Sequence, residues 1–188
     1  MAPLSEGRRA TYHHGALKPA LLDAAARLVA ERGPEGFSLL DAARACGVGA
    51  SAPYRHFADK AALLRGLAQR GQGLMAEFMA GAWAAGADPR GGFAGMGQAY
   101  LRFAREHPGE YAAMFATRGH GFQPDGPGTA LLHQALAAQG YSPQELWRQI
   151  WAISHGAAML ERSGMLDAED SDAVVRDGVA RLLRGAAA

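Results

Sequence analysis

The chain has one cysteine, Cys46, among its 188 residues. An intramolecular disulfide is therefore excluded, and a lone thiol is typical of a protein kept in a reducing cytoplasm. We interpret Cys46 as a small buried filler at a helix end, in preference to a redox switch.

Long apolar runs are also missing. No uninterrupted stretch approaches the ~18 apolar residues that a membrane-spanning helix needs, and the first residues are polar and basic, unlike a secretory leader. We therefore expect a soluble, cytoplasmic protein.

The motifs of catalysis and metal binding are absent as well. We find no glycine-rich phosphate loop, no serine nucleophile motif and no cysteine cluster, and the adjacent His13 and His14 lack ligand spacing on a helix. We expect no metal, no cofactor and no enzymatic activity. Two alternatives stay open: a helical enzyme that uses His155 with Glu161 or Glu106, and a helical protein-interaction adaptor.

The chain has almost no excess of either charge, because its formal net charge is only +1. The basic excess is confined to residues 1–60. With 188 residues, 49% hydrophobic and 20% charged, the chain can form one good core, or a small DNA-reading module and a larger helical one.

The segment 38–60 has the pattern of two short helices joined by a glycine turn. Ser38 and Asp41 have the spacing of a capping box, which predicts a helix that ends near Cys46. Gly47 follows where the chain must turn with positive φ. We predict a second helix from about Ala50 to Phe57.

The side chains of this second helix suit contact with DNA. Its first residues are small enough for close approach to base edges, and later ones offer hydroxyl, guanidinium, imidazole and ammonium donors for phosphates. Asp59 is predicted to cap a third helix that starts at Lys60, and Phe57 to face inward. A plain helical hairpin is the alternative. The candidate DNA contacts are Ser38, Ala50, Ser51, Ala52, Tyr54, Arg55, His56 and Lys60.

Residues 1–15 lack a helical period and are predicted to form a flexible basic arm. Arg8 and Arg9 could reach a minor groove, or the arm could serve solubility alone. A first helix over 16–33 carries the apolar stripe of Leu21, Ala25 and Leu28. We assign residues 16–70 to the DNA-binding domain.

Residues 71–188 are predicted to be helical throughout and to form an effector-binding and dimerisation domain. Glycines are expected to divide a helical stretch over 61–85 near Gly71. Residues 117–129 are expected to form a loop, and Ser142 to Glu145 a capping box with proline at the first helical position. The remaining helices are predicted to begin near positions 88, 107, 130 and 171.

The final two helices are apolar over more than one face. We expect this surface to meet a second copy of the chain, with packing inside a monomer as the alternative. An apolar pocket with one polar group is expected in the same domain. Its candidate lining residues are Phe103, Met114, Phe115, Trp151, His155 and Met159. Ordinary core packing is the alternative for each of them.

Two motifs resemble the DNA-binding domain of the TetR/AcrR family of bacterial regulators: ALKPALLDAAARLVAERG over 16–33 and GVGASAPYRHFADK over 47–60. The resemblance implies base-facing roles for Ala50, Ser51 and Ala52, and phosphate contacts for Tyr54, His56 and Lys60. Family members often carry serine or threonine at the position of Gly49.

The C-terminal half resembles one TetR subfamily. The matching residues are EHPGEYAAMF over 106–115 and the Trp-His-Gly signature of Trp151, His155 and Gly156. The resemblance implies a homodimer through the last two helices and a palindromic DNA operator. It also implies a repressor that is released by a small apolar effector.

Overall fold

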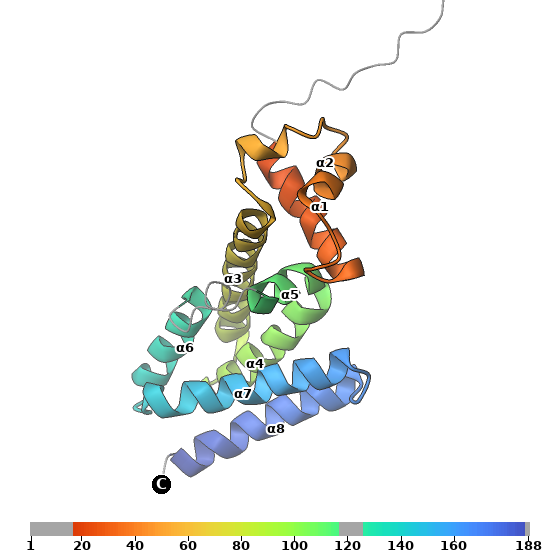
Figure 1. Cartoon of the computed structure of the whole chain (residues 1–188). Coiled ribbons are helices and arrows are strands. Elements are labelled where there is room, and N and C mark those ends of the chain that lie inside the picture. Colours follow the sequence, from red (N-terminus) through yellow and green to blue (C-terminus); the bar gives the residue numbers. More distant parts are fainter. Residues whose placement is uncertain (1–16, 117–125, 187–188) are drawn as a thin grey trace, which may run out of the picture.

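The computed structural model describes residues 17–116 and 126–186, and every regular element in these ranges is helical (Figure 1). The all-α fold class is therefore confirmed. The predicted arm and positions 117–125 of the predicted loop lie outside the described residues. The elements are α1 (Leu17–Arg32), α2 (Leu39–Ala45), the 3-10 turn η1 (Pro53–Arg55), α3 (Lys60–Ala85), α4 (Pro89–Glu106), α5 (Pro108–Ala116), α6 (Pro127–Ala138), α7 (Pro143–Arg162) and α8 (Ala168–Ala186).

The N-terminal unit consists of α1, α2, η1 and the first turns of α3, at the end of the molecule opposite α7 and α8 (Figure 1). Its buried side chains come from α1, α2, α3 and the loops between them, and they belong to one apolar cluster that continues into the C-terminal helices. The predicted stripe on α1 is buried as expected. Leu21, Phe37, Leu39, Phe57 and Leu63 are all at most 6% exposed.

Local signals start the helices of this unit. The Ser38 side chain accepts a hydrogen bond from the Asp41 amide while the Asp41 side chain accepts one from the Ser38 amide, so the predicted capping box is confirmed. Asp59 caps α3 in the predicted way by accepting from the Ala62 amide.

Helix α3 continues through Gly71 without a break, so the predicted division at that residue is wrong. The cause is the packing of α5. A Cβ on Gly71 would lie 2.9 Å from the Met114 sulfur, and therefore the glycine allows α5 to approach α3 closely. With 26 residues, α3 is about 39 Å long, and it extends from the N-terminal unit into the C-terminal one.

The C-terminal unit is built around α4, which packs against α3, α7 and α8. Pro89, Pro108, Pro127 and Pro143 each occupy the first helical position, where an amide donor would have no partner within the helix. Helices α6 and α8 begin three residues earlier than predicted. Helix α7 starts as predicted, but its cap at Ser142 makes no side-chain hydrogen bond, so the capping box expected there is absent.

None of the helices within the described ranges combines the length and the apolar character needed to cross a membrane.

Candidate nucleic-acid interface and effector cavity

The predicted glycine turn is present after α2. Cys46 ends the helix, and Gly47 follows with φ of 67°, which an L side chain rarely adopts. The Val48 amide then donates to the Ala43 carbonyl at 3.1 Å, which completes the helix cap. Burial raises the pKa of the Cys46 thiol, in keeping with a partly buried filler.

The segment after this turn is not the regular helix that was predicted over Ala50 to Phe57. Only Pro53–Arg55 are helical, as a 3-10 turn. The Gly49 carbonyl accepts the Ala52 amide at 3.0 Å, because the next candidate donor four residues on, Pro53, has no N–H. Hydrogen bonds between residues three positions apart therefore predominate here, and only the Phe57 amide reaches four residues back, to the Pro53 carbonyl at 3.0 Å.

Six of the eight predicted DNA contacts nevertheless lie on this one segment. Ala50, Ser51, Tyr54 and Arg55 are exposed. Tyr54 has 61% of its surface exposed, which is unusual for a large aromatic side chain that serves only packing. Ala52 and His56 are half-buried, and Phe57 is buried as predicted.

Lys60 has partners within the chain. Its Nζ donates to the Glu35 carbonyl at 3.2 Å, lies 3.5 Å from the Glu35 carboxylate, and stands 5.2 Å from the centre of the Phe37 ring. This lysine therefore ties the start of α3 to the loop before α2, and contact with a phosphate would compete with the exposed Glu35 carboxylate.

Ser38 is committed to its capping box. Its hydroxyl donates to the Asp41 carboxylate at 2.6 Å and accepts the Asp41 amide at 3.2 Å. The Asp41 carboxylate accepts from the Ser38 hydroxyl and from the Ser38 amide, and these two bonds, the hydroxyl first, lower the pKa of the Asp41 carboxyl. The Ser38 hydroxyl proton is thus unavailable to a phosphate while the box is intact.

Two further cations near this segment were missed in the sequence. The Lys18 ammonium lies 5.9 Å from the centre of the Phe57 ring, and the side chain of Arg44 is 68% exposed. Lys18 sits 42 positions before Lys60 in sequence, so no local pattern could have placed it beside η1.

A narrow cavity of about 30 Å³ lies between α3, α4, α6 and α7. Its lining is apolar and aromatic apart from a few hydroxyl groups, and Trp151 is the one predicted pocket residue that takes part. The lining residues are Met75, Met79, Met96, Gly97, Tyr100, Gly128, Thr129, Leu132, Trp147, Ile150, Trp151 and Ser154.

His155 belongs to a cluster that adjoins this cavity. Its Nδ1 lies 2.9 Å from the hydroxyl oxygens of both Tyr100 and Tyr111, and its ring stacks on Trp151 with centroids 5.1 Å apart. Burial lowers the pKa of His155 and raises the pKa of Tyr100 well above its usual value. Tyr100 and Trp151 connect the cluster to the cavity, because they also line it.

The other predicted pocket residues lie elsewhere. Phe103 and Met114 are fully buried core residues, and Phe115 packs its ring 4.6 Å from that of His155. Met159 is 49% exposed and does not line the cavity, because α7 turns this position outward.

The carboxylates proposed as partners of His155 in an enzyme are engaged with arginines. Glu161 binds Arg105 through both oxygens, at 2.7 and 2.9 Å, and Glu106 lies 3.9 Å from Arg102. The polar contacts of His155 are with tyrosine hydroxyls. The acid–base pair that an enzyme would need at this place is therefore not assembled.

Together, the glycine turn with its exposed basic and aromatic side chains and the long helix leading to an apolar cavity define a helix-turn-helix protein of the regulator class. Residues 21–67 match the family model for bacterial regulatory proteins of the tetR family, and residues 93–182 match that for a tetracyclin repressor-like C-terminal domain. The chain belongs to the tetR family, whose members are transcriptional regulators and not enzymes.

A known protein of similar sequence is also named a transcriptional regulator. Rv0681 of Mycobacterium tuberculosis, named an uncharacterized HTH-type transcriptional regulator, is 31% identical over 98 residues, which are 48% of this chain and 45% of that protein. This match thus spans about half of each protein.

The full fold recurs in solved structures. A protein with unknown function from Rhodococcus sp. RHA1 is 29% identical with a TM-score of 0.78, over 95% of this chain and 99% of that one. The TetR-like regulator LfrR from Mycobacterium smegmatis, solved in complex with proflavine, has 23% identity and a TM-score of 0.65, over 91% of this chain and 96% of that one.

Proposed function

We propose that this protein is a ligand-responsive transcriptional repressor that binds a palindromic operator as a homodimer in the cytoplasm. The observation that carries the proposal is the exposed segment after Gly47, with Ser51, Tyr54 and Arg55 at one end of the molecule. Arg55 and Ser51 are suited to base edges, and Tyr54 to a phosphate. Residues 16–70 form the DNA-binding domain in this proposal, and residues 71–188 the regulatory one.

The dimer would form through α7 and α8. Four large apolar side chains are exposed on these helices and the turn between them, namely Met159, Leu160, Met165 and Val174. A two-fold axis through this surface would present two recognition segments to successive major grooves, about 34 Å apart.

The effector would bind in the cavity between α3, α4, α6 and α7. Its apolar lining favours an uncharged ligand, for which Thr129 or Ser154 supplies a polar contact. At about 30 Å³ the cavity holds roughly one water molecule. Met75 and Met79, whose flexible side chains adapt easily, would have to move aside for a larger ligand.

Release from DNA follows from differential affinity. A ligand that favours a conformation with the wrong spacing of the recognition segments lowers the population that can bind DNA. Helix α3 supports this coupling, since Met75 and Met79 line the cavity while its first turn adjoins η1.

We also propose membership in the subfamily with a Trp-His-Gly signature. Trp151 and His155 stack one helical turn apart, at an interplanar angle of 11°, which supports a common structural role for the two.

To test the proposal, duplexes that the intact protein binds are first selected from a library of random sequences. The affinities of the variants for a selected duplex are then compared by gel shift. Tyr54→Phe and Lys60→Ala should weaken binding to every sequence, and Lys60→Ala should also lower the salt slope by about one, because it removes a charge. Ser51→Ala and Arg55→Ala should change the preferred bases instead. Arg90→Ala, which removes an exposed cation from α4, is the control. Enrichment of no sequence by the intact protein would favour the adaptor alternative.

A further inference from the structure

The junction between α4 and α5 is held rigidly at one residue. The His107 amide donates to the Phe103 carbonyl at 2.8 Å, and the His107 carbonyl accepts the Tyr111 amide at 2.9 Å. The His107 ring stacks on Phe103 and meets the Phe78 edge, each with centroids 5.5 Å apart. The two helices therefore share His107 as a cap, and the angle between them is fixed by packing.

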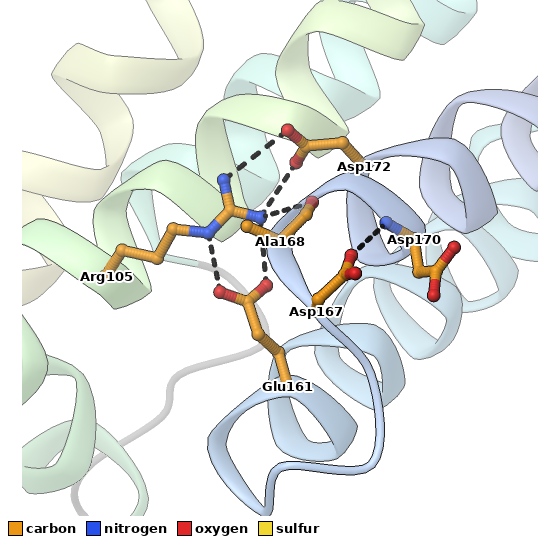
Figure 2. Close-up of polar contacts among 6 residues, drawn as sticks. All are labelled: Arg105, Glu161, Asp167, Ala168, Asp170 and Asp172. Atoms are coloured by element: carbon orange, nitrogen blue, oxygen red, sulfur yellow. Dashed lines mark hydrogen bonds and ion pairs between the residues drawn. The ribbon is translucent and has the colours of Figure 1, made fainter.

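An arginine on one side of this junction binds α7 and α8 (Figure 2). Arg105, in the last turn of α4, contacts both oxygens of Glu161 on α7 at 2.7 and 2.9 Å. It also reaches Asp172 at 2.9 Å and the Ala168 carbonyl at 3.1 Å, both on α8. The planar guanidinium fixes direction as well as distance, because its donors form a rigid fork.

An arginine on the other side binds the N-terminal unit. Glu110, in the first turn of α5, accepts from Arg70 of α3 at 2.7 Å, and its side chain is only 8% exposed. The same guanidinium donates to Asp23 at 2.5 Å and to the Leu22 carbonyl at 3.2 Å, both on α1. Arg70 thereby joins α3 to α1 and α5 through residues that lie 40 or more positions away from it in sequence.

The backbone contact beside this arginine is equally close. A Cβ on Gly109 would overlap the Ala26 carbonyl oxygen, so the start of α5 lies directly on α1. The first turn of α5 thus has no freedom to slide along α1 while Arg70 holds Glu110.

We infer that Arg70 is the positioning residue that sets the place of the DNA-reading segment relative to α7 and α8. Through Asp23 and Glu110 it attaches α1 to the α4–α5 junction, and through Arg105 that junction is attached to α7 and α8. The inference rests on the proposed dimeric, DNA-binding function and deepens it. Met75 of the cavity lies about one and a half helical turns beyond Arg70, so a displacement of α3 by a ligand would reach this attachment directly.

The experiment measures tolerance to the spacing of operator half-sites. One base pair inserted between the half-sites rotates one of them by about 34° relative to the other. Asp23→Ala removes the carboxylate through which Arg70 holds α1, and it leaves the contacts of Arg70 with the Leu22 carbonyl and with Glu110 in place. Glu31→Ala is the matched control, since it removes the same charge from an exposed position of α1 that does not contact Arg70. The double variant R70M/E110L removes both buried charges together.

Intact protein and Glu31→Ala should lose at least about tenfold in affinity on the inserted operator. Asp23→Ala and R70M/E110L should lose less than about threefold, because their recognition segments can reorient. Equal discrimination by all four proteins would overturn the role of Arg70.

A second measurement needs no DNA. Spin labels on Ala45→Cys, an exposed position at the end of α2, in a Cys46→Ala background report the distance between the two DNA-reading ends of a dimer. The distance distribution should be narrow in the intact protein and broad in both Arg70-uncoupling variants, and equal widths would overturn the inference. If the intact protein bound no duplex, the proposed function would be contradicted. The distance between the labels would still test the positioning role of Arg70, because it needs no DNA.

Discussion

At the scale of single residues, the most informative group is the histidine that two tyrosines share. The Nδ1 atom of His155 lies 2.9 Å from the hydroxyl oxygens of both tyrosines. The Trp151 ring stacks on the imidazole, and the Phe115 ring packs against it at a tilt. This environment favours the neutral imidazole, because burial penalises the charged form. His155 is therefore better suited to ordering the wall of the cavity than to carrying charge.

A pH dependence of stability follows. The pKa of His155 is lowered in the folded protein, so the unfolded chain takes up its proton first as the pH falls. The contribution is fully present above the unfolded value near 6.5 and is lost as the pH falls through the folded pKa. Urea unfolding between pH 7.5 and 5.5 should show a steeper loss for the intact protein than for His155→Gln. Parallel curves would contradict this assignment.

At the scale of elements, α3 contains two glycines in different surroundings, one in close contact with α5 and one in open space. Gly71 lies against Met114 and Glu110 of α5, whereas a Cβ on Gly73 would meet nothing within 4 Å. Both are helical, so the helix propensity gained by replacing either with alanine is the same, and the difference between them isolates the helix contact.

Gly71→Ala should therefore destabilise the protein by about 1–3 kcal/mol through overpacking against α5. Gly73→Ala should stabilise it by about 0.5–1 kcal/mol, because alanine loses less backbone entropy in a helix. Chemical denaturation of both variants measures the two values. A stabilising effect of Gly71→Ala would show that α5 yields easily and that its close approach is not required.

Helices α2 and α3 show which features the sequence could predict. The Ser38 capping box, the Gly47 turn and the Asp59 cap depend on neighbours within a few residues, and all three are present. The reason for Gly71 lies 43 residues further along the chain, at Met114, so spacing alone could not distinguish a break from a close contact.

The candidate site likewise has a part that the sequence could predict and a part that it could not. The exposed segment around Tyr54 follows from local motifs. The cavity, by contrast, is assembled from four helices, and Met75, Leu132 and Trp147 entered it without any shared sequence signal. Met159, chosen for its apolar character, lies on the outside of α7.

At the scale of the whole molecule, α7 and α8 lie at the end opposite α1 and α2 (Figure 1), and these two helices carry the exposed apolar side chains Met159, Leu160 and Val174. Such a separation is what a two-fold regulator requires, because one end associates while the other spans two half-sites.

The double variant Met159→Glu/Val174→Glu should convert the dimer into a monomer at micromolar concentration, because it places charges on the apolar surface of both protomers. Sedimentation should then give half the mass, and operator affinity should fall about a hundredfold as the two half-sites lose their linkage. Ala80→Glu, on an exposed position of α3, is the control. An unchanged mass would place the association surface elsewhere.

The unbroken course of α3 also constrains how such a protein can evolve. One residue inserted between Arg70 and Met75 would turn everything beyond it by about 100° and advance it by about 1.5 Å. Met75 and Met79 would no longer line the cavity, while Arg70 would keep its contacts with Asp23 and Glu110. Recombination between relatives can therefore exchange the two ends freely only where the number of residues along this helix is preserved.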